Sequence, residues 1–287
     1  MHFPLLPAPF SRRGFYRFAA FWLTLLIGLP ALAQSGDDAG SSTVSPGGAS
    51  PGASDSTASK TISPDELASL VAPIALYPDA LVAQILMAST YPLEIVEASR
   101  WVKANPDLKS SALEDAMEKQ GWDPSVKSLT AFPQVLAMMN DKLTWTRQLG
   151  DAFLSDQKSV MNSLQSLRQK AKAEGNLETN SQQTVSIEDQ PTGSQSQTII
   201  IQPTNSQVVY VPTYNPTVVY GAWAYPMYPP YYWYPPSYVY TQSVVSFGVG
   251  FAVGAAMWGN CNWHSSNVNI NVNRYNNFNR TKIKNNN

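Results

Sequence analysis

Residues 63–92 read SPDELASLVAPIALYPDALVAQILMASTYP, and this stretch decides the fold class of the chain. It opens with helix-start signals: a serine N-cap at Ser63, a proline at the first helical position, and Glu66, which completes a capping box. Apolar residues then recur at the three- and four-residue spacing of a helix face. Pro78 and Pro92 each stop one helix and start another, because proline cannot continue a helix but fits its first turn. The stretch predicts short helices joined by sharp bends.

The helical pattern extends over residues 62–175. Pro124 and Pro133 start further helices in the same way. From residue 141 to residue 174 the apolar residues keep the period of a helix, which predicts one long final helix ended by Gly175. We therefore expect a mainly α fold: an irregular orthogonal helical bundle with one long C-terminal helix.

A polar stretch separates the helical domain from a region that predicts strands. Residues 176–197 lack an apolar pattern and are interpreted as a linker. Residues 198–220 predict a small β-hairpin, because the β-branched runs 198–201 and 207–211 are separated by a turn that contains proline. The run 217–220 repeats the Val-Val-Tyr of the second strand and predicts a third one.

The C-terminal part has the composition of a largely extended or disordered tail. Residues 221–242 are rich in Tyr and Pro, residues 243–259 in glycine and small apolar residues, and residues 260–287 in Asn and basic residues. The prolines prevent a long helix and interrupt strand ladders. Within the last segment, residues 267–273 alternate strictly between Asn and apolar residues. This alternation predicts a half-buried or self-pairing strand, with Asn-rich disorder as the alternative.

The N-terminus has the pattern of a secretory signal peptide over residues 1–33. A basic segment precedes an apolar one that is too short for an ordinary transmembrane helix. Ala31 and Ala33 fit the cleavage rule, so Gln34 is the expected first residue of the exported chain. A disordered Ser/Gly/Pro linker over residues 34–61 follows. We expect export to the periplasm or cell envelope; the alternative is an uncleaved anchor, and the export route, general secretory or twin-arginine, stays open.

Few residues offer metal or nucleophile chemistry. His264 is the only histidine outside the signal peptide, and Cys261 is the only cysteine, which excludes an internal disulfide, a His-based triad and a multi-His metal site. Together these two residues supply half of a metal site, so we expect no metal and no cofactor. The basic residues do not interleave with the aromatic ones, and the protein is exported, so we do not expect nucleic acid as a partner.

One pair of carboxylates deserves comparison with known catalytic pairs. Glu94 and Glu97 lie one helical turn apart, with Asp79 upstream, and paired carboxylates perform glycoside hydrolysis when burial raises one pKa. Arg100 and Lys103 follow on the same helix, which favours a solvated face with ion pairs. We therefore assign no catalytic residue and expect a protein that is not an enzyme, with a cell-wall glycan hydrolase as the alternative.

Aromatic residues mark the expected contact surface. Tyrosine and tryptophan combine an apolar face with a polar edge, which suits sugar rings, membrane interfaces and partner proteins. The alternative is that this segment wraps the helical domain and buries its rings there. The expected contact residues are Tyr210, Tyr214, Tyr220, Trp223, Tyr225, Tyr228, Tyr231, Tyr232, Trp233 and Tyr234.

The glycine-rich segment suggests a second kind of contact. Gly250 and Gly254 have the small-xxx-small spacing that lets helices approach closely in a bilayer, and Gly248 precedes them. The uncharged stretch around them is roughly twenty residues long, which is about bilayer length. Membrane insertion as an oligomer is therefore one expectation, and packing on the helical domain or self-association is the other.

Several motifs resemble those of a known bacterial family, the domain of unknown function 3300. They are LVAPIALYPDAL (70–81), QILMASTYP (84–92), AFP (131–133), QLGDAF (148–153), VYVP (209–212) and VNINVNRYNNFN (268–279). The resemblance implies an uncharacterised exported protein that associates with the membrane through its apolar C-terminal stretch, and it implies no catalytic residues. We expect an envelope protein that is an interaction or structural module for the cell membrane, a cell-wall polymer or other envelope proteins.

Overall fold

The computed structural model describes residues 62–189, 197–234, 244–248, 250–252 and 259–270. The chain divides into two units, Met1–Thr57 and Ala58–Asn287, and every described residue belongs to the second. The expected signal peptide, including Ala31, Ala33 and Gln34, and the expected linker over residues 34–61 lie outside the described residues.

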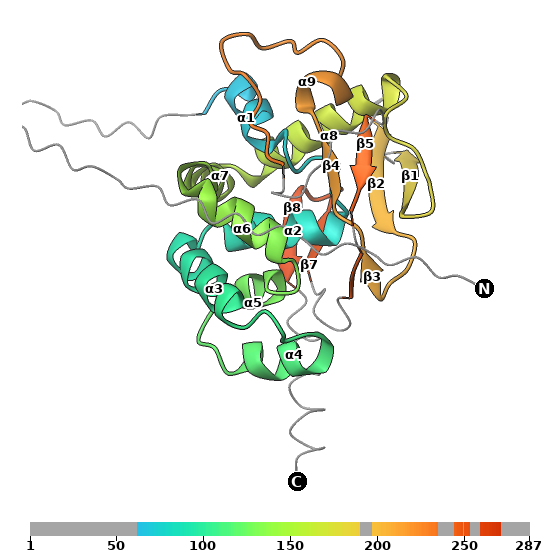
Figure 1. Ribbon diagram of the computed structural model, residues 1–287. Helices are drawn as coiled ribbons and strands as arrows, with labels where there is room; N and C mark the ends of the chain where they lie inside the picture. Colours follow the sequence, from blue (N-terminus) through green and yellow to red (C-terminus); the bar gives the residue numbers. More distant parts are fainter. Residues whose placement is uncertain (1–61, 190–196, 235–243, 249, 253–258, 271–287) are drawn as a thin grey trace, which may run out of the picture. The chain divides into compact units, whose positions relative to one another are not determined.

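The first part of the described chain is helical, as the sequence predicts (Figure 1). Ser63 caps the first helix: its Oγ accepts a hydrogen bond from the backbone N of Glu66 at 3.2 Å. In this part of the chain, prolines occupy the first turn of α1, α3, α5 and α6. The helices are α1 (Pro64–Val71), α2 (Asp79–Ala88), α3 (Pro92–Ala104), α4 (Ser110–Glu118), α5 (Pro124–Leu129), α6 (Pro133–Asp141), α7 (Leu143–Ser155) and α8 (Gln157–Ala173).

The long final helix expected over residues 141–174 is instead two helices, α7 and α8. They meet at Asp156, whose backbone is not helical (φ −155°, ψ 86°). The Asp156 carboxylate accepts hydrogen bonds from Ser159, from the backbone N at 3.0 Å and from Oγ at 2.6 Å, and these bonds lower the pKa of Asp156. The apolar period continues on both sides of this cap, so the period alone did not reveal the break.

The end of α8 agrees with the sequence. Gly175 adopts a positive φ of +71°, and its N–H donates to Lys172 O at 3.0 Å. The N–H of Asn176 donates to Ala171 O at 2.8 Å, which completes a Schellman motif. A residue with a Cβ is strained in this left-handed backbone conformation, which explains the glycine.

Small antiparallel strand pairs follow the helices, and the pairing differs from the expected hairpin (Figure 1). The range expected to be a polar linker contains β1 (Gln183–Asp189), which pairs with β2 (Gln197–Pro203). The second expected strand is β3 (Val208–Val209), which pairs with β6 (Phe251–Ala252) instead of β2. The remaining strands are β4 (Pro212–Tyr214), β5 (Val245–Phe247), β7 (Gly259–Asn262) and β8 (Asn267–Ile270), in the pairs β4–β5 and β7–β8.

The third expected strand, residues 217–220, is also different. Most of it belongs to a short helix, α9 (Pro216–Val219). The Asn215 side chain accepts a hydrogen bond from the backbone N of Thr217 at 3.0 Å, and Pro216 occupies the first helical turn. This asparagine–proline start favours a helix over the β propensity of the valines that follow.

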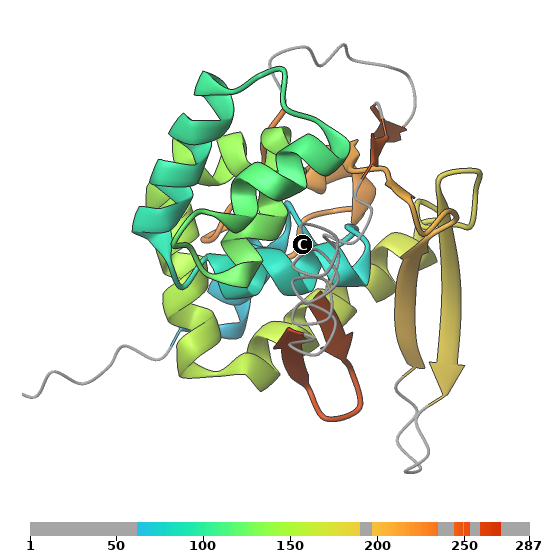
Figure 2. The same ribbon diagram turned by 90° about the horizontal axis from the view of Figure 1, so that it is seen from below.

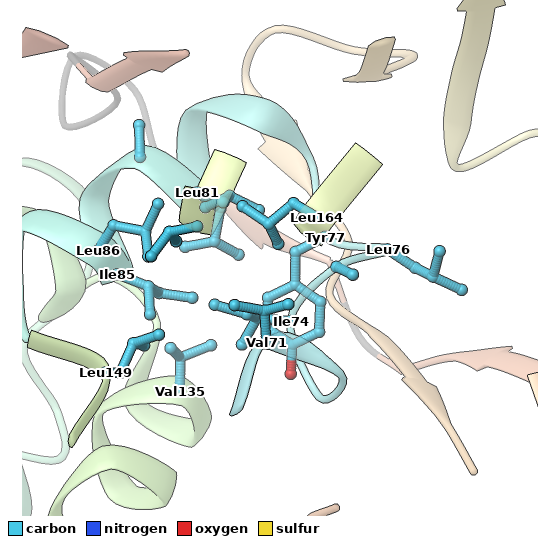
Figure 3. Packing of buried hydrophobic residues seen from close by; sticks show 14 of the residues in the cluster. Val71, Ile74, Leu76, Tyr77, Leu81, Ile85, Leu86, Val135, Leu149 and Leu164 are labelled. Atoms are coloured by element: carbon cyan, nitrogen blue, oxygen red, sulfur yellow. The ribbon is translucent and has the colours of Figure 1, made fainter. Parts of the chain in front are cut away.

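Helix α2 lies at the centre of the hydrophobic core (Figure 3). Apart from Asp79 and Gln84 it consists of apolar residues, which is typical of a helix buried on every face. Leu81, Ile85 and Leu86 are each 0% exposed. Helix α2 packs against α5, α7, β2, β7 and β8, so it touches both the helical domain and the strands that follow it. Each buried leucine or isoleucine contributes about 1.5–3 kcal/mol of transfer free energy to this arrangement.

Part of the expected Asn-rich tail folds onto α2 (Figure 2). Strand β7 comes so close that a Cβ at Gly259 would lie 2.9 Å from the carbonyl oxygen of Ala80. The alternating pattern correctly predicts a strand in its first four residues, which form β8. Residues 259–270 are therefore ordered structure and not an extended tail, whereas the rest of the expected basic segment lies outside the described residues.

Candidate functional site

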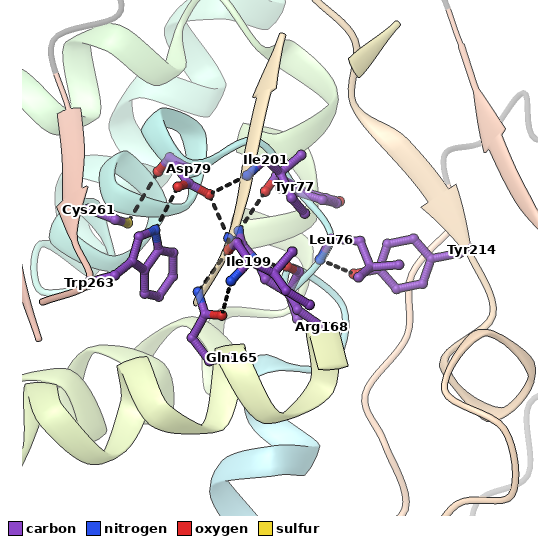
Figure 4. A network of polar contacts seen from close by, with 11 residues as sticks. Leu76, Tyr77, Asp79, Gln165, Arg168, Ile199, Ile201, Tyr214, Cys261 and Trp263 are labelled. Carbon is purple, nitrogen blue, oxygen red and sulfur yellow. Dashed lines mark hydrogen bonds and ion pairs between the residues drawn. The ribbon is translucent and has the colours of Figure 1, made fainter. Parts of the chain in front are cut away.

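A buried ion pair joins two helices of the helical domain, α8 and α2 (Figure 4). Arg168 on α8 is 0% exposed, and its Nη1 lies 2.6 Å from Asp79 Oδ1 at the start of α2. The guanidinium also donates to the carbonyl oxygens of Ala75 (2.8 Å), Ile199 (2.9 Å) and Tyr77 (3.0 Å). These bonds satisfy a charge that would otherwise be costly to bury.

The C-terminal hairpin completes this cluster (Figure 4). Trp263 Nε1, in the turn between β7 and β8, donates to Asp79 Oδ2 at 2.6 Å, and Ile201 N donates to Asp79 Oδ1 at 3.2 Å. The Arg168 guanidinium lies 4.7 Å from the centre of the Trp263 ring, a cation–π distance. We call Asp79, Arg168 and Trp263 the buried network. Both carboxylate oxygens of Asp79 accept hydrogen bonds from protein donors, which indicates a structural role for this network.

Cys261 belongs to the same region. Its thiol is buried and donates to the Asp79 carbonyl oxygen at 3.3 Å. Burial, with the nearby Asp79 carboxylate, raises the pKa of the Cys261 thiol well above its ordinary value. The thiol is therefore protonated at neutral pH and is not a surface thiol of the tail. Among the described residues, no group of three or more His, Cys, Asp or Glu side chains could hold a metal ion.

Two of the expected contact residues lie in the core. Tyr214 and Tyr220 are 4% and 3% exposed, and their hydroxyls donate to Ala72 O at 3.0 Å and 2.7 Å. Tyr77 is buried beside them, and we call these three residues the tyrosine cluster. Burial raises the pKa of all three hydroxyls. For Tyr214 and Tyr220 the expected surface role is corrected: they anchor the segment that follows the helical domain.

The next aromatic residues form contacts within the Tyr/Pro segment and with α8. Trp223 is half-buried, and its Nε1 donates to Tyr225 O at 3.1 Å and to Tyr228 O at 2.9 Å. The Tyr225 ring lies 4.6 Å from Lys170 Nζ, which attaches the segment to α8. Tyr210, also half-buried, lies against Gly250, where an added Cβ would be 2.9 Å from the tyrosine ring.

Four further expected residues line a groove between the Tyr/Pro segment and the helical domain: Tyr228, Tyr231, Tyr232 and Trp233. Ser69 Oγ donates to Pro229 O at 2.6 Å, and Tyr231 N donates to Ser69 O at 3.2 Å, so the segment is fastened to α1. Tyr231 and Tyr232 are 39% and 59% exposed. The groove has a volume of about 570 Å³, within the range of small-molecule sites. We call it the aromatic groove; its lining includes Glu66, Ser69, Leu70, Pro73, Met138, Lys142, Trp145, Gln148, Tyr228, Tyr231, Tyr232 and Trp233.

Tyr234, the last expected contact residue, is half-buried. Its ring centre lies 5.7 Å from that of Tyr232, so it extends the aromatic surface beyond the groove.

The described glycines of the apolar segment do not lie on a helix. Gly248 and Gly250 stand between β5 and β6, and both strands pair with strands of this chain. A Cβ at Gly250 would collide with the Val208 side chain, so this glycine allows close packing on β3. Gly254 lies outside the described residues. Among the described residues, none of the helices has both the length and the apolarity needed to span a membrane.

The carboxylates considered for hydrolysis have structural contacts. Glu97 Oε2 accepts a hydrogen bond from Trp122 Nε1 at 3.1 Å, and Glu94 Oε2 accepts one from the backbone N of Asp123 at 2.7 Å. Both bonds tie α3 to the start of α5. The Asp123 carboxylate, followed by partial burial, raises the pKa of the neighbouring Tyr91 hydroxyl. Asp79, the third carboxylate considered, is in the buried network and not beside this pair.

The sequence contained one signal for the buried network that motif analysis missed. Arg168 follows Leu164 by four residues and therefore lies on the apolar face of α8, where a charge requires a buried partner. The sequence does not say that this partner is Asp79, 89 residues earlier in the chain.

These features define a mainly helical protein with small antiparallel hairpins folded onto it. The chain belongs to the family described as "Protein of unknown function (DUF3300)", whose model matches residues 63–287. It is 41% identical over 212 residues to the uncharacterized protein YacH of Escherichia coli (strain K12). That match covers 65% of this chain and 34% of YacH, so the chain matches about a third of the length of this relative. No solved structure matches the chain.

Proposed function

We propose that this protein is a non-enzymatic protein of the bacterial cell envelope, exported by its signal peptide, that acts as an interaction module for a cell-wall polymer. The aromatic groove is the observation that carries this proposal. The backbone of its Tyr/Pro side is fastened to α1 by hydrogen bonds at Pro229 and Tyr231, and the rings of Tyr231 and Tyr232 are accessible to solvent. A fixed and exposed aromatic wall can bind a ligand at a low cost in conformational entropy.

The shape of the groove favours a chain-like partner over a flat bilayer. The Tyr/Pro segment forms one side of the groove, whereas Leu70, Met138 and Trp145 come from helices of the domain. A ligand in the groove therefore touches both sides at once. Charged and amide side chains line it as well, which suits a polar polymer with apolar faces.

The two alternative functions receive less support. A glycan hydrolase would require Glu94 and Glu97 to be available for proton transfer, and both accept hydrogen bonds that hold α3 against α5. Membrane insertion through the glycine-rich segment would require Gly250 to face another helix, and this glycine packs on β3.

Co-sedimentation with purified cell-wall sacculi tests the proposed function. We expect the exported chain to pellet with sacculi and Tyr232→Ala to reduce the bound fraction several-fold, because the variant removes the most exposed ring of the groove. Leu154→Ala is the matched control, since Leu154 is 70% exposed and is not among the residues that line the groove.

Parallel samples with phospholipid vesicles identify the competing partner. Pelleting with vesicles but not with sacculi would identify the membrane, and not the cell wall, as the partner. Pelleting with neither would refute the proposal, and so would equal binding by the Tyr232→Ala variant.

A further inference from the structure

We infer that the aromatic groove recognises a glycan that carries acetamido groups. This inference rests on the proposed function and adds the chemical class of the ligand. An acetamido group combines an N–H donor, a carbonyl acceptor and a methyl group. The groove presents a matching set: an acceptor, donors and an apolar floor, all beside exposed aromatic faces.

Gln148 supplies an oriented donor. Its Oε1 accepts a hydrogen bond from the Tyr231 hydroxyl at 3.1 Å, which fixes the side-chain amide. Within the described part of the chain, its Nε2 has no hydrogen-bond partner, although Gln148 is half-buried in the groove lining. A half-buried amide nitrogen of this kind gains when a ligand carbonyl or hydroxyl accepts from it.

Glu66 and Lys142 supply an acceptor and a second donor. Glu66 is half-buried on α1, and Lys142 is exposed between α6 and α7. Neither forms an ion pair with another of the described residues. The Glu66 carboxylate can accept from an acetamido N–H or a hydroxyl, and the Lys142 ammonium can donate to a carbonyl or carboxylate.

The floor of the groove is apolar. Leu70, Met138 and Trp145 are 2%, 1% and 3% exposed, and they line the groove together with Pro73. The Trp145 indole N–H already donates to Leu70 O at 2.9 Å, so this ring presents carbon atoms to the groove. A methyl group placed on this floor leaves water at little cost, whereas a hydroxyl in the same place would lose hydrogen bonds.

Paired oligosaccharides test this inference by calorimetry. A tetramer of β-1,4-linked N-acetylglucosamine is compared with cellotetraose, which has the same linkage and a hydroxyl in place of each acetamido group. With the exported chain, we expect the N-acetylated tetramer to bind and cellotetraose to bind at least about tenfold more weakly. Cellotetraose lacks the one or two hydrogen bonds and the buried methyl group that each bound acetamido group provides.

Two variants separate stacking from acetamido recognition. Tyr232→Ala should weaken binding of both tetramers by a similar factor, because it removes a stacking face. Gln148→Leu should weaken the N-acetylated tetramer more than cellotetraose and so reduce the preference. Leu154→Ala should change neither affinity, and unchanged circular dichroism spectra and melting temperatures show that the variants are folded.

Each other result overturns the inference in a distinguishable way. Equal binding of the two tetramers, or a preference unchanged by Gln148→Leu, refutes acetamido recognition and leaves the proposed function standing. Failure of both tetramers while sacculi still pellet the protein shows that another wall component is bound. Failure of the tetramers and of sacculi refutes both proposals.

Discussion

Removal of the charge on Asp79 should destabilise the protein strongly. Arg168 is completely buried, and Asp79 provides the only ion pair recorded for it among the described residues. The variant Asp79→Asn preserves the size of the side chain and one acceptor oxygen but leaves the guanidinium without a counter-charge. Breaking a buried pair from one side costs about 3–5 kcal/mol in the free energy of unfolding.

Urea unfolding measures this loss. With a slope of about 2 kcal/mol per molar urea, the midpoint should fall by roughly 2 M. Asp151→Asn is the matched control, because Asp151 is exposed on α7, and such surface changes stay within about 0.5 kcal/mol. The double variant Asp79→Leu with Arg168→Met should be less destabilised than Asp79→Asn, since no charge remains buried. If Asp79→Asn shifts the midpoint no further than Asp151→Asn does, the assignment of this ion pair is refuted.

Three further outcomes are expected. The three hydroxyls of the tyrosine cluster have raised pKa values, so their contribution to stability is complete below about pH 10 and is lost above it. The free energy of unfolding should fall by about 1.4 kcal/mol per pH unit for each tyrosine that ionises only in the unfolded chain. Urea unfolding at pH 8 and pH 11 should show this loss of stability, and Tyr214→Phe should make the loss smaller. Gly150→Ala should lower stability by about 1–3 kcal/mol, because its Cβ would lie 2.7 Å from the Ser89 carbonyl carbon, whereas Gly121→Ala, with no atom within 4 Å, should be nearly neutral in thermal melts. Cys261 should resist a thiol reagent in the native protein and react upon unfolding, and rapid native labelling would contradict its burial.

The helices could be predicted because their signals are local. The Ser63 cap and Gly175 at the end of α8 act through hydrogen bonds to residues within five positions. The prolines at helix starts act through their own fixed φ and the missing N–H. The break at Asp156 is equally local, yet the continuous apolar period hid it.

The strand pairing could not be predicted in the same way. Strand β3 had a nearer candidate in β2, but it pairs with β6, more than forty residues further along the chain. The apolar groups that decide between these partners belong to the helical domain. The sequence of either strand alone therefore does not specify which strand it pairs with.

The aromatic groove, too, could be predicted from the sequence only in part. The sequence identified the aromatic residues but not which of them are accessible. Tyr214 and Tyr220 are buried, whereas Tyr231 and Tyr232, from the same segment, remain exposed. Gln148 gave no signal, since it is an ordinary polar residue on a helix, and Glu66 was identified only as part of the capping box and not as a groove residue.

The sequence by itself determined the helical class, the family and the starts of the helices that a cap or a proline marks within residues 63–133, because these signals act over a few residues. Only the tertiary structure decided that Asp79, Arg168 and Trp263 meet, and that the Tyr/Pro segment is fastened to α1. Those contacts join residues 89 to 184 positions apart. Their formation depends on burying a common apolar core, a property of the whole chain that no short stretch carries.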